Sequence, residues 1–94
     1  MSKTLVENVK EYLGITTNDE DVTRNILIKA NAVKNYLIKA GAKIDENNYD
    51  EAIIACIATG VNDLLNNKAG DTKFSPAFNM LAMQICVGWY YAIY

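Results

Sequence analysis

Apolar residues recur every three or four positions along most of this 94-residue chain, which is the spacing of helices that bury one face. No stretch shows the strict alternation expected of strands. The pattern predicts an all-α protein, a single domain over residues 1–94 that forms a small bundle of about four helices with a hydrophobic C-terminal helix. The predicted helices cover about residues 3–13, 17–41, 48–65 and 76–94.

Residues that cap helices mark several of these boundaries. The second helix is expected to begin with a capping box, in which the Thr17 hydroxyl and the Glu20 carboxylate accept hydrogen bonds from free backbone N–H groups. A similar sequence over 48–51 begins the third helix. The fourth helix is expected to begin at Pro76, because Ser75 is a good N-cap and proline is favoured in the first turn.

The third helix contains Gly60 within its apolar stripe. A glycine inside a helix costs about 1 kcal/mol relative to alanine, so this residue predicts that a neighbouring backbone packs closely against the helix. The core stripes are predicted at Val22, Ile26, Ala30, Val33, Leu37 and Ala40 in the second helix, and at Tyr49, Ile53, Ile57, Gly60, Val61 and Leu64 in the third.

The C-terminal segment 74–94 contains no Asp, Glu, Lys or Arg, although charged residues make up 21% of the chain. At helical spacing one side of it is an ordinary core face, formed by Phe78, Leu81, Ala82, Ile85, Trp89 and Ala92. The opposite side is also apolar or aromatic. A helix that is apolar all round is expected in the middle of a bundle, in a membrane or at a subunit interface.

The subunit interface is the interpretation that this segment favours. Asn79 and Gln84 are poorly suited to hydrocarbon, and no basic residue follows the segment to anchor it at a membrane surface. Three short helices cannot easily enclose a fourth, so part of its second face remains available to another chain. The predicted interface residues are Met80, Met83, Val87, Trp89, Tyr90, Tyr91 and Tyr94.

Charge and chemistry narrow the function classes further. A net charge of −2 and scattered basic residues argue against a surface that binds nucleic-acid phosphates. The absence of histidine removes the commonest general base and metal ligand. Acidic runs at 19–21 and 45–51 are explained as residues that cap helices and complement their dipoles. We therefore expect no catalytic residue, metal or cofactor, and no enzyme activity.

The two cysteines, Cys56 and Cys86, are too few for a disulfide scaffold and too far apart for a CxxC site. Both have apolar neighbours, so each is expected to be a small core residue in a reduced, intracellular setting. Residues 1–10 are polar and show no secretory signal peptide.

The order of elements resembles the head–tail connector, or adaptor, proteins of tailed bacteriophages, and the resemblance spans essentially the whole chain. It is carried by the segment Val9-Lys10-Glu11-Tyr12-Leu13-Gly14-Ile15, by acidic residues that open the second helix, by Asn35-Tyr36-Leu37 within that helix, and by Trp89-Tyr90 late in the last helix.

The resemblance implies a structural role in the virion. Proteins of this family form a homo-oligomeric ring below the portal protein, extend the DNA channel without sequence-specific binding, and receive a stopper or tail-completion protein. The expected location is the neck between capsid and tail, after assembly in the bacterial host cytoplasm. The loop 66–73 is a candidate contact for the next ring, through Asn66, Asn67, Lys68, Asp71 and Lys73.

Two alternatives stay open at this stage. The chain could be a small cytoplasmic helical binding or regulatory module, with Arg24, Lys34 and Lys39 as candidate nucleic-acid contacts. It could also be a membrane-associated phage protein that uses residues 76–94.

Overall fold

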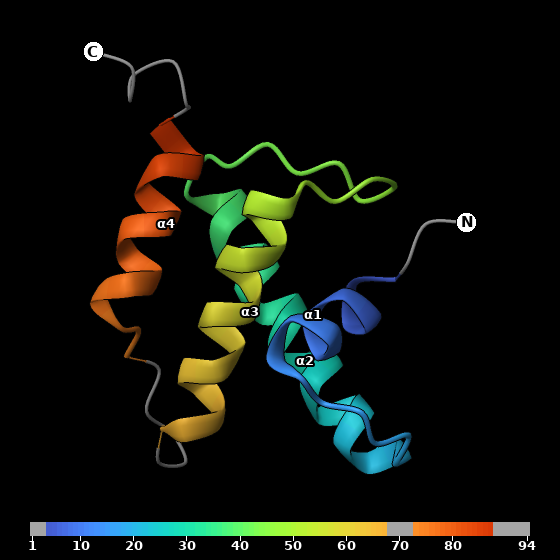
Figure 1. Ribbon diagram of the computed structural model, residues 1–94. Helices are drawn as coiled ribbons and strands as arrows, with labels where there is room; N and C mark the ends of the chain where they lie inside the picture. Colours follow the sequence, from blue (N-terminus) through green and yellow to red (C-terminus); the bar gives the residue numbers. More distant parts are fainter. Residues whose placement is uncertain (1–3, 68–72, 88–94) are drawn as a thin grey trace.

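The computed structural model describes residues 4–67 and 73–87. Val87 is described by its backbone alone. Over these residues the chain is a bundle of four helices without strands, which confirms the all-α prediction (Figure 1). The helices are α1 (Leu5–Leu13), α2 (Glu20–Lys39), α3 (Glu51–Asn66) and α4 (Pro76–Val87).

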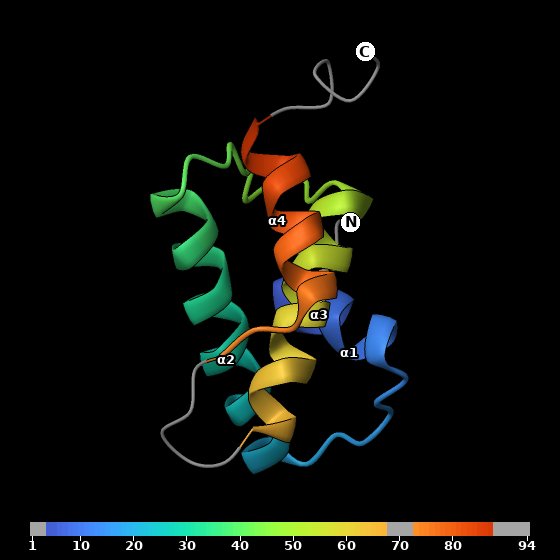
Figure 2. The same ribbon diagram turned by 90° about the vertical axis from the view of Figure 1, so that its left-hand side faces the viewer.

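Helix α3 lies at the centre and packs against each of the other three helices. Figures 1 and 2 show α4 on one side of α3 and α1 on the other, with α2 crossing beside them. The position of α3 explains why its buried residues extend around most of its circumference, whereas α2 buries a single stripe. The buried residues of α3 are Ile53, Ile54, Cys56, Ile57, Ala58, Gly60 and Val61, and those of α2 are Ile26, Ala30, Val33 and Leu37.

The predicted capping box at the start of α2 is wrong by two residues. The N-cap is Asp19, whose Oδ1 accepts hydrogen bonds from the backbone N–H groups of Asp21 at 2.8 Å and Val22 at 3.1 Å. The Thr17 hydroxyl instead accepts a hydrogen bond from the backbone N–H of Asp19, at 3.2 Å. Thr17 therefore shapes the turn that leads into the cap.

The start of α3 shows the same displacement. Its N-cap is Asp50, which accepts a hydrogen bond from the backbone N–H of Ala52 at 2.9 Å. Asn48, the predicted first residue of the cap sequence, donates its backbone N–H to the Asp45 carbonyl within the preceding loop. An ion pair between Lys34 of α2 and Glu46 holds this loop against the bundle.

Gly60 is the point where three helices meet, but the close neighbour is not a backbone as predicted. A Cβ atom added at Gly60 would lie 2.7 Å from Cε1 of Phe78 and 2.9 Å from Cγ1 of Val33. Both of these side chains have no exposed surface. Glycine is needed at this position because the Phe78 ring of α4 and the Val33 side chain of α2 occupy the space of its missing side chain.

We therefore predict that Gly60→Ala destabilises the protein, although alanine is the better helix former. The favourable propensity change of about 1 kcal/mol is outweighed by overpacking, which typically costs about 1–3 kcal/mol. Urea unfolding measures the difference. Phe78→Leu relieves part of the contact, so the alanine should be better tolerated in that background. A stabilised Gly60→Ala variant would show that the Phe78 ring moves aside freely.

Candidate interaction surface on the last helix

The start of α4 is joined to α3 by a partly buried polar contact. Oδ2 of Asp63 accepts hydrogen bonds from the backbone N–H of Ser75 at 2.9 Å and from its hydroxyl at 2.8 Å. The Ser75 hydroxyl oxygen in turn accepts a hydrogen bond from the backbone N–H of Phe78 at 3.2 Å, as the predicted N-cap should. The Asp63 carboxylate also lies where the dipole of α4 favours negative charge.

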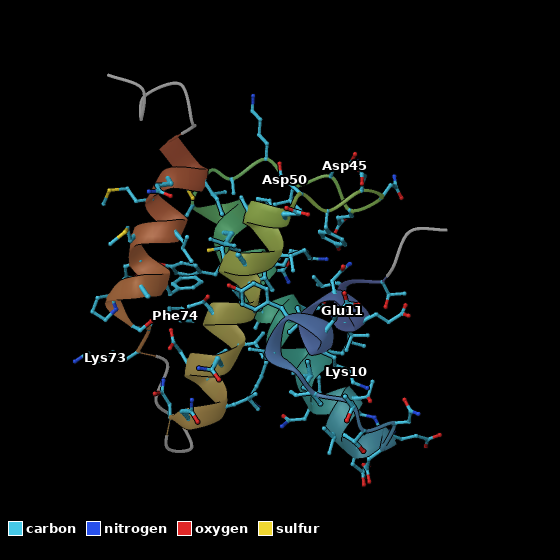
Figure 3. The ribbon with its side chains drawn as sticks, viewed as in Figure 1. Lys10, Glu11, Asp45, Asp50, Lys73 and Phe74 are labelled. Atoms are coloured by element: carbon cyan, nitrogen blue, oxygen red, sulfur yellow. The ribbon has the colours of Figure 1, made fainter. Side chains whose placement is uncertain are left out.

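Three aromatic rings hold α4 against α2. Phe74 and Phe78 stack with their centroids 4.1 Å apart, and Tyr36 of α2 lies 5.4 Å from Phe74 and 6.0 Å from Phe78. Figure 3 shows Phe74 at the start of α4, on the side that faces the other helices. Aromatic pairs at these distances contribute about 0.5–1.5 kcal/mol beyond the apolar area they bury. The cluster and the Asp63 contact together set which side of α4 faces inward.

The inward side of α4 is the predicted core face, as far as the structure describes it. Phe78 is fully buried, and Leu81, Ala82 and Ile85 are partly buried against the core. The opposite side is open: the exposed fraction of Met80 is 63% and that of Met83 is 68%. We call the exposed residues Ala77, Asn79, Met80 and Met83 the α4 outer face.

The α4 outer face has unusual chemistry for an exposed helix surface. Residues 76–87 contain no charged side chain, so no ionic group surrounds the two methionines on this helix. Exposed methionine adapts its shape to apolar partners and is common at protein–protein contacts. A surface of this kind suits another protein chain and offers no group for acid–base, metal or phosphate chemistry.

The other predicted interface residues in the C-terminal segment are not all placed. Val87 belongs to α4, and its side chain lies outside the described part of the structure. The remaining predicted residues, Trp89, Tyr90, Tyr91 and Tyr94, also lie outside it. The role of these residues in an interface stays a prediction.

The predicted contact loop for the next ring is described only at its two ends. The side-chain amide of Asn67 donates a hydrogen bond to the Lys73 carbonyl at 2.7 Å, which brings these ends together. Asn66 is exposed beside them, and the Lys73 side chain extends away from the helices (Figure 3). Lys68 and Asp71 lie outside the described residues.

The basic residues considered for nucleic-acid binding do not form a patch. Arg24 lies 3.7 Å from the Asp21 carboxylate, and Lys34 is the partner of Glu46. Lys39 is exposed in the last turn of α2. Neighbouring carboxylates reduce the positive potential on which phosphate binding depends. In the described part of the chain, no helix combines the length and apolarity that crossing a membrane requires.

The cysteines occupy the core region between α3 and its neighbours. Cys56 is fully buried, whereas Cys86 is half-buried with its Sγ atom 3.9 Å from the Leu37 carbonyl oxygen. Both are free thiols. Burial raises the pKa of the Cys56 thiol from 9.0 to about 12, and the Cys86 thiol adds to the increase. Cys56 is therefore a neutral core residue, as its apolar neighbours predict.

Two residues that determine the geometry of this surface were missed in the sequence. Asp63 lies on α3, whereas the backbone N–H that it accepts from belongs to Ser75 at the start of α4, twelve positions later. Phe74 precedes α4 and was not assigned to its core face. The only sequence signal for either is indirect: a polar residue near the end of the α3 stripe, and an aromatic residue immediately before the N-cap.

No family model matches this chain, and no curated protein or solved structure is significantly similar to it.

Replacing Ser75 by alanine is expected to lower the free energy of unfolding by about 0.5–2 kcal/mol, because it removes the N-cap of α4 and one donor to Asp63. Urea unfolding gives the total loss, and hydrogen exchange should show it first in the α4 amides. Thr17→Ala is the matched control, since this hydroxyl accepts a turn hydrogen bond without capping a helix. Equal losses in both variants would contradict a capping role for Ser75.

The buried Cys56 thiol predicts a fall in stability at high pH. The unfolded chain loses this proton near pH 9, whereas the folded chain keeps it until about pH 12. Stability is therefore retained below pH 9 and lost as the pH rises toward 12, by up to about 1.4 kcal/mol per pH unit. Urea unfolding across this range should show a steeper decline for the parent than for Cys56→Ala. Parallel declines would assign the effect to other groups.

Proposed function

We propose that this protein is a non-enzymatic structural component of a tailed bacteriophage virion, a head–tail connector that forms a ring below the portal. In this role it extends the DNA channel and receives a stopper or tail-completion protein. The single observation that carries the proposal is the α4 outer face, where Met80 and Met83 are exposed on a helix without charge. The whole-chain resemblance to connector proteins supplies the type of assembly.

The surface chemistry is compatible with such a ring. A ring needs a contact between two different surfaces of neighbouring copies, and an apolar surface on one helix provides one side of that contact. The net charge of −2 also disfavours tight binding to DNA phosphates, so DNA can pass through the channel without being held. Assembly would occur in the host cytoplasm and leave the protein in the neck of the virion.

The test is to charge the α4 outer face. In the double variant Met80→Asp and Met83→Asp, ring formation would bury two carboxylates in the proposed contact. Burying these charges without partners costs several kcal/mol and should abolish ring formation. The monomer should keep its helicity in circular dichroism, because both side chains are exposed. Negative-stain electron microscopy of the protein mixed with the portal protein of the same phage measures assembly.

Ile28→Asp is the matched control, since Ile28 is 61% exposed on α2 and also receives a carboxylate. The parent and the control should add a ring to the portal, and the double variant should not. Absence of a ring with the parent protein would overturn the proposed function. Unfolding of the double variant would instead show that the α4 outer face belongs to the core.

A further inference from the structure

A cleft of about 370 Å³ lies between α1 and the start of α3. It is on the opposite side of α3 from α4, as Figure 3 shows by the positions of Glu11 on α1 and Phe74 beside α4. The cleft is therefore separate from the α4 outer face. It is lined by Asn8, Glu11 and Tyr12 of α1 and by Tyr49, Glu51 and Ile54 around the start of α3.

The lining combines aromatic rings with carboxylates. Tyr12 is 56% exposed and Tyr49 is partly buried against the core, and both tyrosines line the cleft. Glu11 and Glu51 contribute negative charge from the two helices, and none of the described residues that line the cleft is basic. Aromatic faces attract cations, and carboxylates accept charge-assisted hydrogen bonds from them. The cleft therefore has the chemistry of a site for a cationic group.

The shape and size narrow the class of cation. The volume of the cleft is near the lower end of the range of ligand pockets, about 300–1,000 Å³, and leaves room for one long side chain of a partner. A guanidinium group is planar, stacks on aromatic rings and donates two parallel hydrogen bonds to a carboxylate, whereas an ammonium group does neither. Arginine matches the two tyrosines and the carboxylates better than lysine does.

We propose that this cleft binds an arginine side chain of a partner polypeptide, with the guanidinium stacked on tyrosine and hydrogen-bonded to Glu51 and Glu11. Asn8 and Glu11 also interact within the chain, and an ionised carboxylate has about four acceptor sites, so such an interaction does not preclude a further donor. The site does not depend on the role proposed for α4.

The first test is a titration of the full chain, labelled with ¹⁵N, with the peptide acetyl-Gly-Arg-Gly-amide. Saturable shifts are expected for amides of α1 and the start of α3, and these shifts should be absent with the citrulline peptide, which has the same shape without the charge. The lysine peptide should bind at least about threefold more weakly, since it lacks the stacked, two-donor geometry. Equal binding of arginine and citrulline peptides, or of arginine and lysine peptides, would overturn the assignment.

The second test uses two matched glutamates. Glu51 and Glu20 each occupy the first position of a helix, so Gln at either site changes the net charge and the helix start in the same way. Glu51→Gln should weaken binding of the arginine peptide at least about threefold, whereas Glu20→Gln should leave it within about twofold. Equal weakening by both variants would show a general charge effect and would overturn the site.

The occupant could also come from a second copy, because Arg24 is exposed and is the sole arginine of the chain. If the shifts of the cleft amides appear without peptide on raising the protein concentration and vanish in Arg24→Gln, the site is a self-contact and the partner assignment fails. Concentration-independent spectra of the free protein are the expected result.

Discussion

The contact between Gly60 and Phe78 is the constraint on which the arrangement of this bundle depends. Helix α3 packs against each of the other three helices, and Gly60 lets both the α4 ring and Val33 of α2 reach its backbone. A larger residue would push α4 outward and move Phe78 away from Tyr36 of α2. The close packing of three helices is therefore obtained by leaving out a side chain at their meeting point.

The same contact determines which residues α4 leaves exposed. Because Phe78 is fixed against Gly60, and Asp63 fixes the start of the helix through Ser75, α4 cannot rotate to bury its methionines. The exposure of Met80 and Met83 is thus a consequence of well-determined packing on the inner side. A helix held this firmly presents its apolar surface in one geometry, which lowers the ordering cost of binding another chain.

The sequence predicted the helices and their buried faces well, but it predicted the N-cap residues of α2 and α3 poorly. The four helices and the buried side of α4 follow from hydrophobic spacing, because burial at one position constrains those three and four residues away. The caps of α2 and α3 were misplaced, since Thr17 and Asp19, like Asn48 and Asp50, are all good N-caps. The turns around them, which involve hydrogen bonds to Asp19 and Asp45, decide between the candidates.

Hydrophobic spacing could not predict the features that are formed by two helices together. The Asp63 contact with Ser75 forms only because the end of α3 lies beside the start of α4. The cleft between α1 and α3 can be predicted only when the relative positions of these two helices are known. Hydrophobic spacing shows which face of a helix is buried, but it does not show which helix covers that face.

Helix α3 separates two surfaces that differ in chemistry. The α4 outer face is uncharged and depends on burial of apolar area, whereas the α1–α3 cleft carries Glu11 and Glu51. Electrostatic attraction in an open cleft is screened by salt, and apolar contact is not weakened in this way. The two surfaces share no lining residue and lie on opposite sides of α3, so the two proposed contacts use separate parts of the molecule. A component that must contact two different neighbours at once needs this separation, and a single central helix provides it.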